Sequence, residues 1–184
     1  MSLSSTFLSL VKKFSTDLDV QKLRHDVFVF AGRYPDLSRD RLAQKLIDRT
    51  AAKAAAIGAV ASLPPGIAAF AAMGPELSAL LVLQSRLVVG LHVLYGRDPE
   101  PEERALEILA GLASGAGMSF GRQFGARAAE EVAAKIVARY AARGLGRLVP
   151  LVGVVTGGLL NYLAVKAVGK ATLLRLSRGP GDRG

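Results

Sequence analysis

The sequence predicts an all-α fold, a multi-helix bundle whose hydrophobic helical hairpins pack along glycine-lined seams. Apolar residues recur at helical spacing through most of the 184-residue chain, and the short β-branched runs at 27–30 and 152–155 lie inside longer helical patterns. Hydrophobic residues make up 51% of the chain but aromatic residues only 6%, so small aliphatic side chains dominate and favour close helix packing. Glycines also recur at four-residue spacing in two regions, which places them on one face of a helix.

Charge and hydropathy predict an affinity for anionic surfaces. The net charge is +9, and the mean hydropathy of +0.32 is high for a soluble protein. Lipid headgroups fit this combination better than nucleic acid, because nucleic-acid-binding modules of this size are usually more polar and use exposed aromatic residues for stacking. The absence of cysteine excludes a disulfide scaffold and a thiolate metal site.

We divide the chain into an N-terminal arm (1–35), a hydrophobic helical domain (36–176) and a basic tail (177–184) that we expect to be disordered. The arm has the spacing of one or two amphipathic helices. It is either an interfacial membrane helix or an arm packed over the core. No secretory signal is evident, because Lys12 and Lys13 interrupt the first apolar patch.

The domain begins with a predicted helical hairpin. Ser38 can cap a long helix that runs into an alanine-rich segment, and no charged residue occurs from Ala54 to Pro75. Pro64-Pro65-Gly66 interrupts this apolar span, because two adjacent prolines cannot lie inside a straight helix. The predicted arms are Arg49–Leu63 and Ile67–Met73, each shorter than the roughly 20 residues that cross a bilayer.

Terminal signals predict two further helices. We expect Pro75 to open a helix that ends at Gly96, and Asp98 with Pro99 to begin the next one. The second helix leads into a glycine-rich run. Each glycine inside a helix costs roughly 1 kcal/mol relative to alanine, so close helix packing is the favoured reason for the run and a loop is the alternative. The glycines expected to pack are Gly117, Gly121 and Gly125.

Residues 126–143 are predicted to form a basic helix. Lys135, Arg139 and Arg143 lie on one four-residue row, and Glu131 can pair with Lys135. The row is either a solvated face or a contact for the phosphates of anionic membrane lipid.

The stretch from Pro150 onward is expected to be the main packing seam. Gly153, Gly157 and Asn161 recur every four residues, which makes a shallow groove with one polar group set into it. The expected partners of this seam are the Gly117–Gly125 run and the Ala54–Met73 hairpin.

Three polar residues, Glu76, Gln84 and Arg86, stand inside an apolar helical pattern and are predicted to be buried. A buried carboxylate needs a partner, and Arg86 or Asn161 are the candidates for Glu76. The alternative is that Glu76 is a satisfied contact or cap at the start of a helix.

We find no catalytic constellation, cofactor motif or metal-ligand cluster in the sequence. The two histidines, His25 and His92, lie in different segments. Gly153 to Gly158 is not a phosphate-binding loop, because no Lys-Ser/Thr follows it and no strand is predicted before it. We therefore assign no catalytic, cofactor-binding or metal-binding residue. Glu76 and His92 would be the candidates if the protein acted on lipid.

Several of these residues resemble the pattern of the EcsC family of bacterial proteins. The resemblance covers residues 50–175 and extends to a domain attached to some bacterial GTPases. It implies a helical, hydrophobic, membrane-associated protein with no established catalytic residues, and one family member is encoded beside an exporter-type ABC transporter. The residues that carry it are Ile57-Gly58, Pro64-Pro65-Gly66, Glu76, Gln84, Tyr95-Gly96-Arg97-Asp98, Pro150, Gly153, Gly157, Gly158 and Asn161.

These observations lead to one expected function and two alternatives. We expect a non-enzymatic, membrane-associated helical protein on the cytoplasmic side of the membrane, either peripheral or inserted by its hairpins, and accessory to a transporter or to membrane remodelling. A soluble helical adaptor for an ABC transporter or a GTPase is the first alternative, and a lipid-acting enzyme is the second. Anionic membrane lipid is the expected partner, whereas nucleic acid is not, and the oligomeric state is left open.

Overall fold

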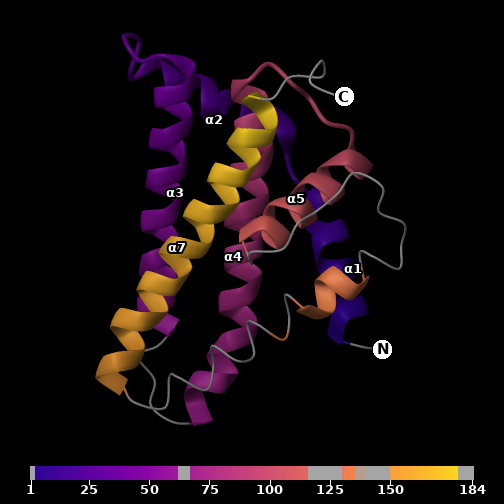
Figure 1. Cartoon of the computed structure of the whole chain (residues 1–184), viewed down its shortest axis with the longest axis vertical. Coiled ribbons are helices and arrows are strands. Elements are labelled where there is room, and N and C mark those ends of the chain that lie inside the picture. Colours follow the sequence, from indigo (N-terminus) through magenta and orange to yellow (C-terminus); the bar gives the residue numbers. More distant parts are fainter. Residues whose placement is uncertain (1–2, 62–66, 116–129, 136–137, 139–149, 178–184) are drawn as a thin grey trace.

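The computed structural model describes residues 3–61, 67–115, 130–135, 138 and 150–177. The regular structure of these residues is helical, with no strand among them, so the predicted all-α fold is confirmed (Figure 1). The Gly117–Gly125 run and the 178–184 tail lie outside the described residues. The helices are α1 (Leu3–Thr16), α2 (Val20–Gly32), α3 (Arg39–Ala61), α4 (Ile67–Leu94), α5 (Pro101–Gly115) and α7 (Pro150–Ser177).

The N-terminal arm consists of two helices that pack against the rest of the chain. Phe7 and Val11 of α1 are buried in a cluster that includes Leu112 of α5 and Val132. In α2, the buried residues Leu23 and Val27 pack beside α4, and Asp19 caps the helix by accepting a hydrogen bond from the backbone N–H of Lys22. These contacts fit the alternative in which the N-terminal arm packs over the core.

The predicted hairpin is formed by α3 and α4, which run in opposite directions, while α7 crosses the front of the bundle beside α3 (Figure 1). Ser38 accepts a hydrogen bond from the backbone N–H of Arg41 at 3.4 Å, so it caps α3 as expected. The contact between α3 and α7 is the most extensive helix contact that the structure shows. The fold therefore closes where the C-terminal helix meets the first arm of the hairpin.

The helix start predicted at Pro75 is wrong, because α4 runs without interruption from Ile67 to Leu94 and includes Pro75. A proline inside a helix loses one backbone hydrogen bond and costs about 3 kcal/mol. Burial compensates, since a fully buried leucine contributes about 1.5–3 kcal/mol. The buried leucines of α4 are Leu80, Leu81, Leu87 and Leu91.

The predicted start of the following helix is also wrong, by two residues. Gly96 ends α4 with a φ of 71°, as expected of glycine. However, α5 begins at Pro101, and the Glu103 carboxylate accepts a hydrogen bond from the backbone N–H of Glu100 at 3.3 Å. Asp98 does not cap this helix but forms an ion pair with Arg24. The sequence misleads here because it contains two successive acidic-residue–proline pairs, Asp98-Pro99 and Glu100-Pro101, and either can begin a helix.

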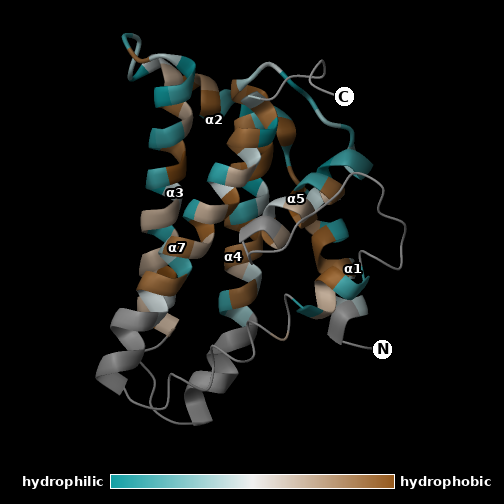
Figure 2. Cartoon of the chain, viewed as in Figure 1, coloured by the Kyte–Doolittle hydropathy of each residue, from teal (hydrophilic) through white to brown (hydrophobic). Residues whose placement is uncertain are grey.

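Helix α4 is the centre of the bundle, because it contacts α1, α2, α3, α5 and α7. Among the described helices, its Pro75–Leu94 segment is long and apolar enough to cross a membrane by length and composition, with a mean hydropathy of 1.8. A core helix passes the same test, and 56% of the segment is buried inside the protein. In Figure 2 hydrophilic residues run along the outer edge of α3.

Candidate functional site

The glycine seam of α7 lies against α3. A Cβ atom built on Gly58 of α3 would come within 2.5 Å of the Gly157 carbonyl oxygen, and one on Gly158 would come within 3.0 Å of the Ala55 carbonyl oxygen. The two backbones therefore approach too closely for side chains at these points. The structure thus places Gly157 against the hairpin, one of its two expected partners. Gly153 lies in the same helix, three residues after its start.

Asn161 joins this crossing to α4. Its side-chain amide donates a hydrogen bond of 2.8 Å to the carboxylate of Glu76. Asn161 is 2% exposed and Glu76 is 7% exposed, so both polar groups are buried at the crossing of α4 with α7. A buried hydrogen bond to a charged group contributes about 1.5–3 kcal/mol, and either partner left alone would be costly. This buried pair therefore holds α7 against α4 and is not an accessible reaction centre.

The two other residues predicted to be buried, Gln84 and Arg86, differ in their exposure to solvent. Gln84 is 1% exposed, and its side-chain oxygen and nitrogen have no hydrogen-bond partner among the described residues. Arg86 is not buried: its side chain is 37% exposed and forms an ion pair of 2.8 Å with Asp26 of α2. The prediction for Arg86 failed because α4 has one side turned toward α2, where a charged group can reach water.

The basic face predicted on residues 126–143 is described in part. Lys135 is exposed and forms an ion pair of 2.7 Å with Glu131, one helical turn earlier. The hydrogen bond and charge of Lys135 hold the pKa of the Glu131 carboxyl below its usual range. Arg139 and Arg143 lie outside the described residues. The charge of Lys135 is thus already balanced within its own helix.

A second polar cluster, in which His92 is buried and Glu107 and Arg175 are partly exposed, joins α4, α5 and α7. His92 donates its Nδ1–H to the Val88 carbonyl at 2.8 Å, which turns Nε2 toward the Glu107 carboxylate at 3.9 Å. Glu107 also pairs with Arg175 at 2.9 Å. Burial lowers the pKa of Arg175, and the charge of Glu107 opposes that shift. These side chains interact with one another across three helices, so they link the helices together.

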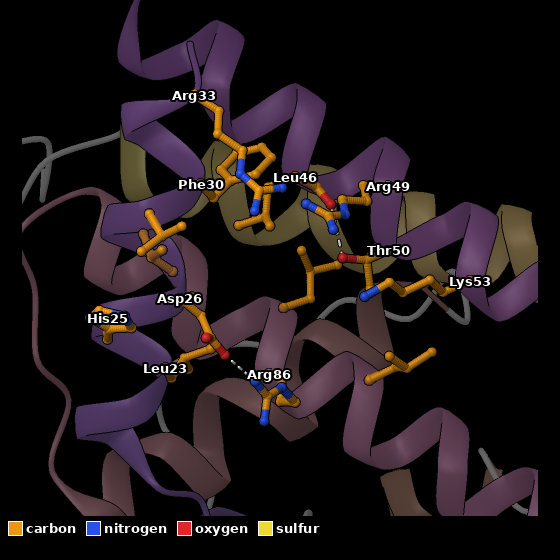
Figure 3. A pocket seen from close by; sticks show the side chains of 15 residues that line it. Leu23, His25, Asp26, Phe30, Arg33, Leu46, Arg49, Thr50, Lys53 and Arg86 are labelled. Atoms are coloured by element: carbon orange, nitrogen blue, oxygen red, sulfur yellow. Dashed lines mark hydrogen bonds and ion pairs between the residues drawn. The ribbon is translucent and has the colours of Figure 1, made fainter. Parts of the chain in front are cut away.

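A cavity in the described residues opens between α2, α3 and α4 and has a volume of about 370 Å³. Its lining combines apolar side chains from all three helices with the charged groups of Arg33, Arg49, Lys53, Arg86 and Asp26. Figure 3 shows Arg33, just after the end of α2, and Arg49 of α3 extending over the cavity, with Arg86 and Asp26 paired below them. An apolar cavity with a few converging polar groups is the usual form of a binding site for a small molecule.

Two of the pocket cations belong to a longer row on α3 that the sequence analysis missed. Arg41, Lys45, Arg49 and Lys53 follow one another at four-residue spacing, and all four are exposed. None forms an ion pair with another described residue, although Lys45 lies 4.4 Å from the ring of Tyr34 and Arg49 lies 6.0 Å from that of Phe30. The same four-residue spacing that marks the basic row at 126–143 is visible in the sequence here.

Such a row is slightly unfavourable in the free protein. Like charges four residues apart on a helix destabilise it by about 0.2–0.5 kcal/mol for each pair, and this row contains three successive pairs. A bound anion would relieve that repulsion. The row and the pocket together form the strongest candidate for a binding site in the part of the chain that the structure describes.

Metal chemistry gains no support from the described residues, since no group of three or more His, Asp or Glu side chains there is placed to hold a metal ion. In comparisons with known proteins, no protein-family model, no curated protein and no solved structure matches the chain. The resemblance to the EcsC family therefore stays a prediction.

Proposed function

We propose that the protein is a non-enzymatic, membrane-associated helical protein that binds anionic lipid surfaces through the face formed by α2 and α3. The observation that carries this proposal is the exposed cation row of α3, which has no ion pair within the described residues. Each Lys or Arg near an anionic bilayer contributes about 1 kcal/mol, so four would supply about 4 kcal/mol. That is enough for reversible binding to a membrane surface.

Exposed apolar side chains on α2 support the same proposal. Phe28 is 77% exposed and Val29 is 38% exposed, and both lie on the helix that forms one wall of the pocket. Exposed aromatic and aliphatic side chains are suited to the boundary between headgroups and acyl chains. Since the cytoplasmic leaflet carries the anionic lipids that attract basic segments, we place the protein on that side. The resemblance to the EcsC family points the same way and suggests an accessory role beside a transporter or in membrane remodelling.

Vesicle flotation tests this proposal. The protein should float with vesicles that contain phosphatidylglycerol and stay behind with pure phosphatidylcholine. Replacing Arg41 and Lys45 by glutamine should weaken binding about thirtyfold, because two surface charges are worth about 2 kcal/mol. The matched control is Lys135→Gln, whose charge is already balanced by Glu131.

Equal flotation on neutral vesicles, or no effect of the double substitution, would contradict binding through the cation row. A protein that floats with neither kind of vesicle would favour the soluble-adaptor alternative.

A further inference from the structure

We propose that the pocket between α2, α3 and α4 binds a single anionic lipid molecule. Its phosphate headgroup would lie against Arg33, Arg49 and Lys53, and the first part of its acyl chain would lie on the apolar lining. This inference rests on the proposed membrane function and names the lipid class that the site selects. It is carried by the shape, the charge and the lining of the pocket.

The apolar lining can accept a hydrocarbon chain. Apolar side chains from all three helices form it, and Gly90 contributes no side chain at a point where a methyl group would fit, 3.6 Å from Val27 and 3.7 Å from Leu46. The volume of about 370 Å³ lies within the range of about 300–1,000 Å³ for small-molecule sites. That volume suits a headgroup with the first carbons of one chain. The apolar residues of the lining include Leu23, Val27, Phe30, Leu46, Leu83 and Leu87.

The charge of the pocket matches a phosphate. Asp26 neutralises Arg86 through their ion pair, whereas Arg33, Arg49 and Lys53 have no ion pair with a described residue. Three uncompensated cations fit a doubly charged phosphate group better than a single carboxylate, and the planar guanidinium forks of arginine can donate two hydrogen bonds each. The Arg49 guanidinium also lies over the ring of Phe30, at the junction of the charged and apolar parts.

Calorimetric titration with dodecanoyl lysophosphatidate, below its critical micelle concentration, tests the inference. We expect saturable binding of one molecule per chain. Inorganic phosphate supplies the charge without the chain, and monododecanoylglycerol supplies the chain without the charge. Both should bind at least about tenfold more weakly, because each lacks one half of the recognition.

Substitutions then locate the site. Arg49→Gln should weaken lysophosphatidate binding about tenfold, while Arg41→Gln, on the same helix but outside the pocket, should leave it unchanged. Gly90→Ala should also weaken binding, because its methyl group takes room from the chain, although this variant should fold normally.

The proposal is overturned if inorganic phosphate or monododecanoylglycerol binds as tightly as lysophosphatidate, or if Arg41→Gln causes the same loss as Arg49→Gln. Flotation with anionic vesicles but no binding of monomeric lysophosphatidate would overturn the pocket proposal and leave the surface proposal standing. Binding of lysophosphatidate without flotation would support the pocket and contradict the proposed membrane function.

Discussion

At the scale of single residues, the contact between Asn161 and Glu76 shows how one amide can fix the position of two helices. The amide donates to the carboxylate at 2.8 Å, and both side chains are buried. A neutral donor satisfies the carboxylate without adding a second charge to the core. The chemistry of position 161 therefore determines whether α4 and α7 can pack with the Glu76 side chain between them.

Asn161→Asp should make the stability of the protein depend on pH. Two carboxyl groups at this distance cannot both ionise, so they share a proton and the pKa of one is raised above its unfolded value. The folded state then binds more protons than the unfolded state, and its stability rises as pH falls. We expect an unfolding free energy about 3 kcal/mol below that of the wild type at pH 7, with a smaller difference near pH 5. Denaturant unfolding at both pH values measures it.

Asn161→Ala is the matched control, because it removes the donor without adding a charge. It should lose about 1–3 kcal/mol at both pH values. A pH dependence in Asn161→Asp no larger than in Asn161→Ala would show that residue 161 does not face the carboxylate of Glu76.

Sequence reasoning identified this polar contact but not the charged face. Asn161 and Glu76 stood out because each is a polar residue inside an apolar pattern, which demands a partner. Arg86 met the same criterion, yet it reaches the rim of the pocket and pairs with Asp26. The pocket itself joins residues from three helices, so its existence depends on how α2 lies on the α3–α4 hairpin. That arrangement leaves no signal in the spacing of any one helix.

At the scale of helices, the crossing of α3 with α7 depends on glycine, whereas a glycine of α4 leaves room for alanine. A Cβ on Gly58 would lie 2.4 Å from the Asn161 amide nitrogen and 2.5 Å from the Gly157 carbonyl oxygen. A Cβ on Gly90 of α4 would meet its neighbours at 3.6 Å or more. The first contact is a clash with backbone, which cannot move cheaply, and the second is ordinary van der Waals contact.

The two glycines should therefore respond to alanine with opposite signs. Gly58→Ala should lower the unfolding free energy by about 3 kcal/mol, or the melting temperature by roughly 6–12 °C, because α3 and α7 must separate. Gly90→Ala should raise the unfolding free energy by about 0.5–1 kcal/mol, because alanine is the better helix former. Thermal and denaturant unfolding of both variants decides the matter. Equal effects would mean that α7 does not approach α3 as closely as the structure shows.

Helix identity was predictable from the sequence, whereas helix boundaries were less so. The glycine spacing indicated a close crossing and named the hairpin as one partner, since small residues at this period have few other uses. Pro75 and Asp98 misled because each is a good terminal signal. Because α4 is buried, the helix continues through Pro75. The following helix begins at Pro101, after Glu100, and not at Pro99 after Asp98.

At the scale of the whole molecule, the central position of α4 bears on how the protein meets a membrane. Its Pro75–Leu94 segment is the apolar stretch that would otherwise suggest insertion. Yet α4 contacts all the other helices named above, and it carries the buried groups of Gln84 and His92. Moving α4 into lipid would give up that packing and expose these polar groups to hydrocarbon. Peripheral binding through α2 and α3 leaves the core intact, so it is the mode we propose.

Peripheral binding predicts release by salt alone. Protein bound to phosphatidylglycerol vesicles at low ionic strength should return to the supernatant in about 1 M salt, because the screening length falls to about 3 Å and the attraction of the cation row is lost. Hydrogen exchange should show the amides of Pro75–Leu94 equally protected with and without vesicles, since α4 stays in the core. Retention through the salt wash, with release only by detergent, would mean that a hairpin inserts. A change in exchange confined to α2 and α3 is what the surface mode requires, because those helices carry the cations and the exposed Phe28.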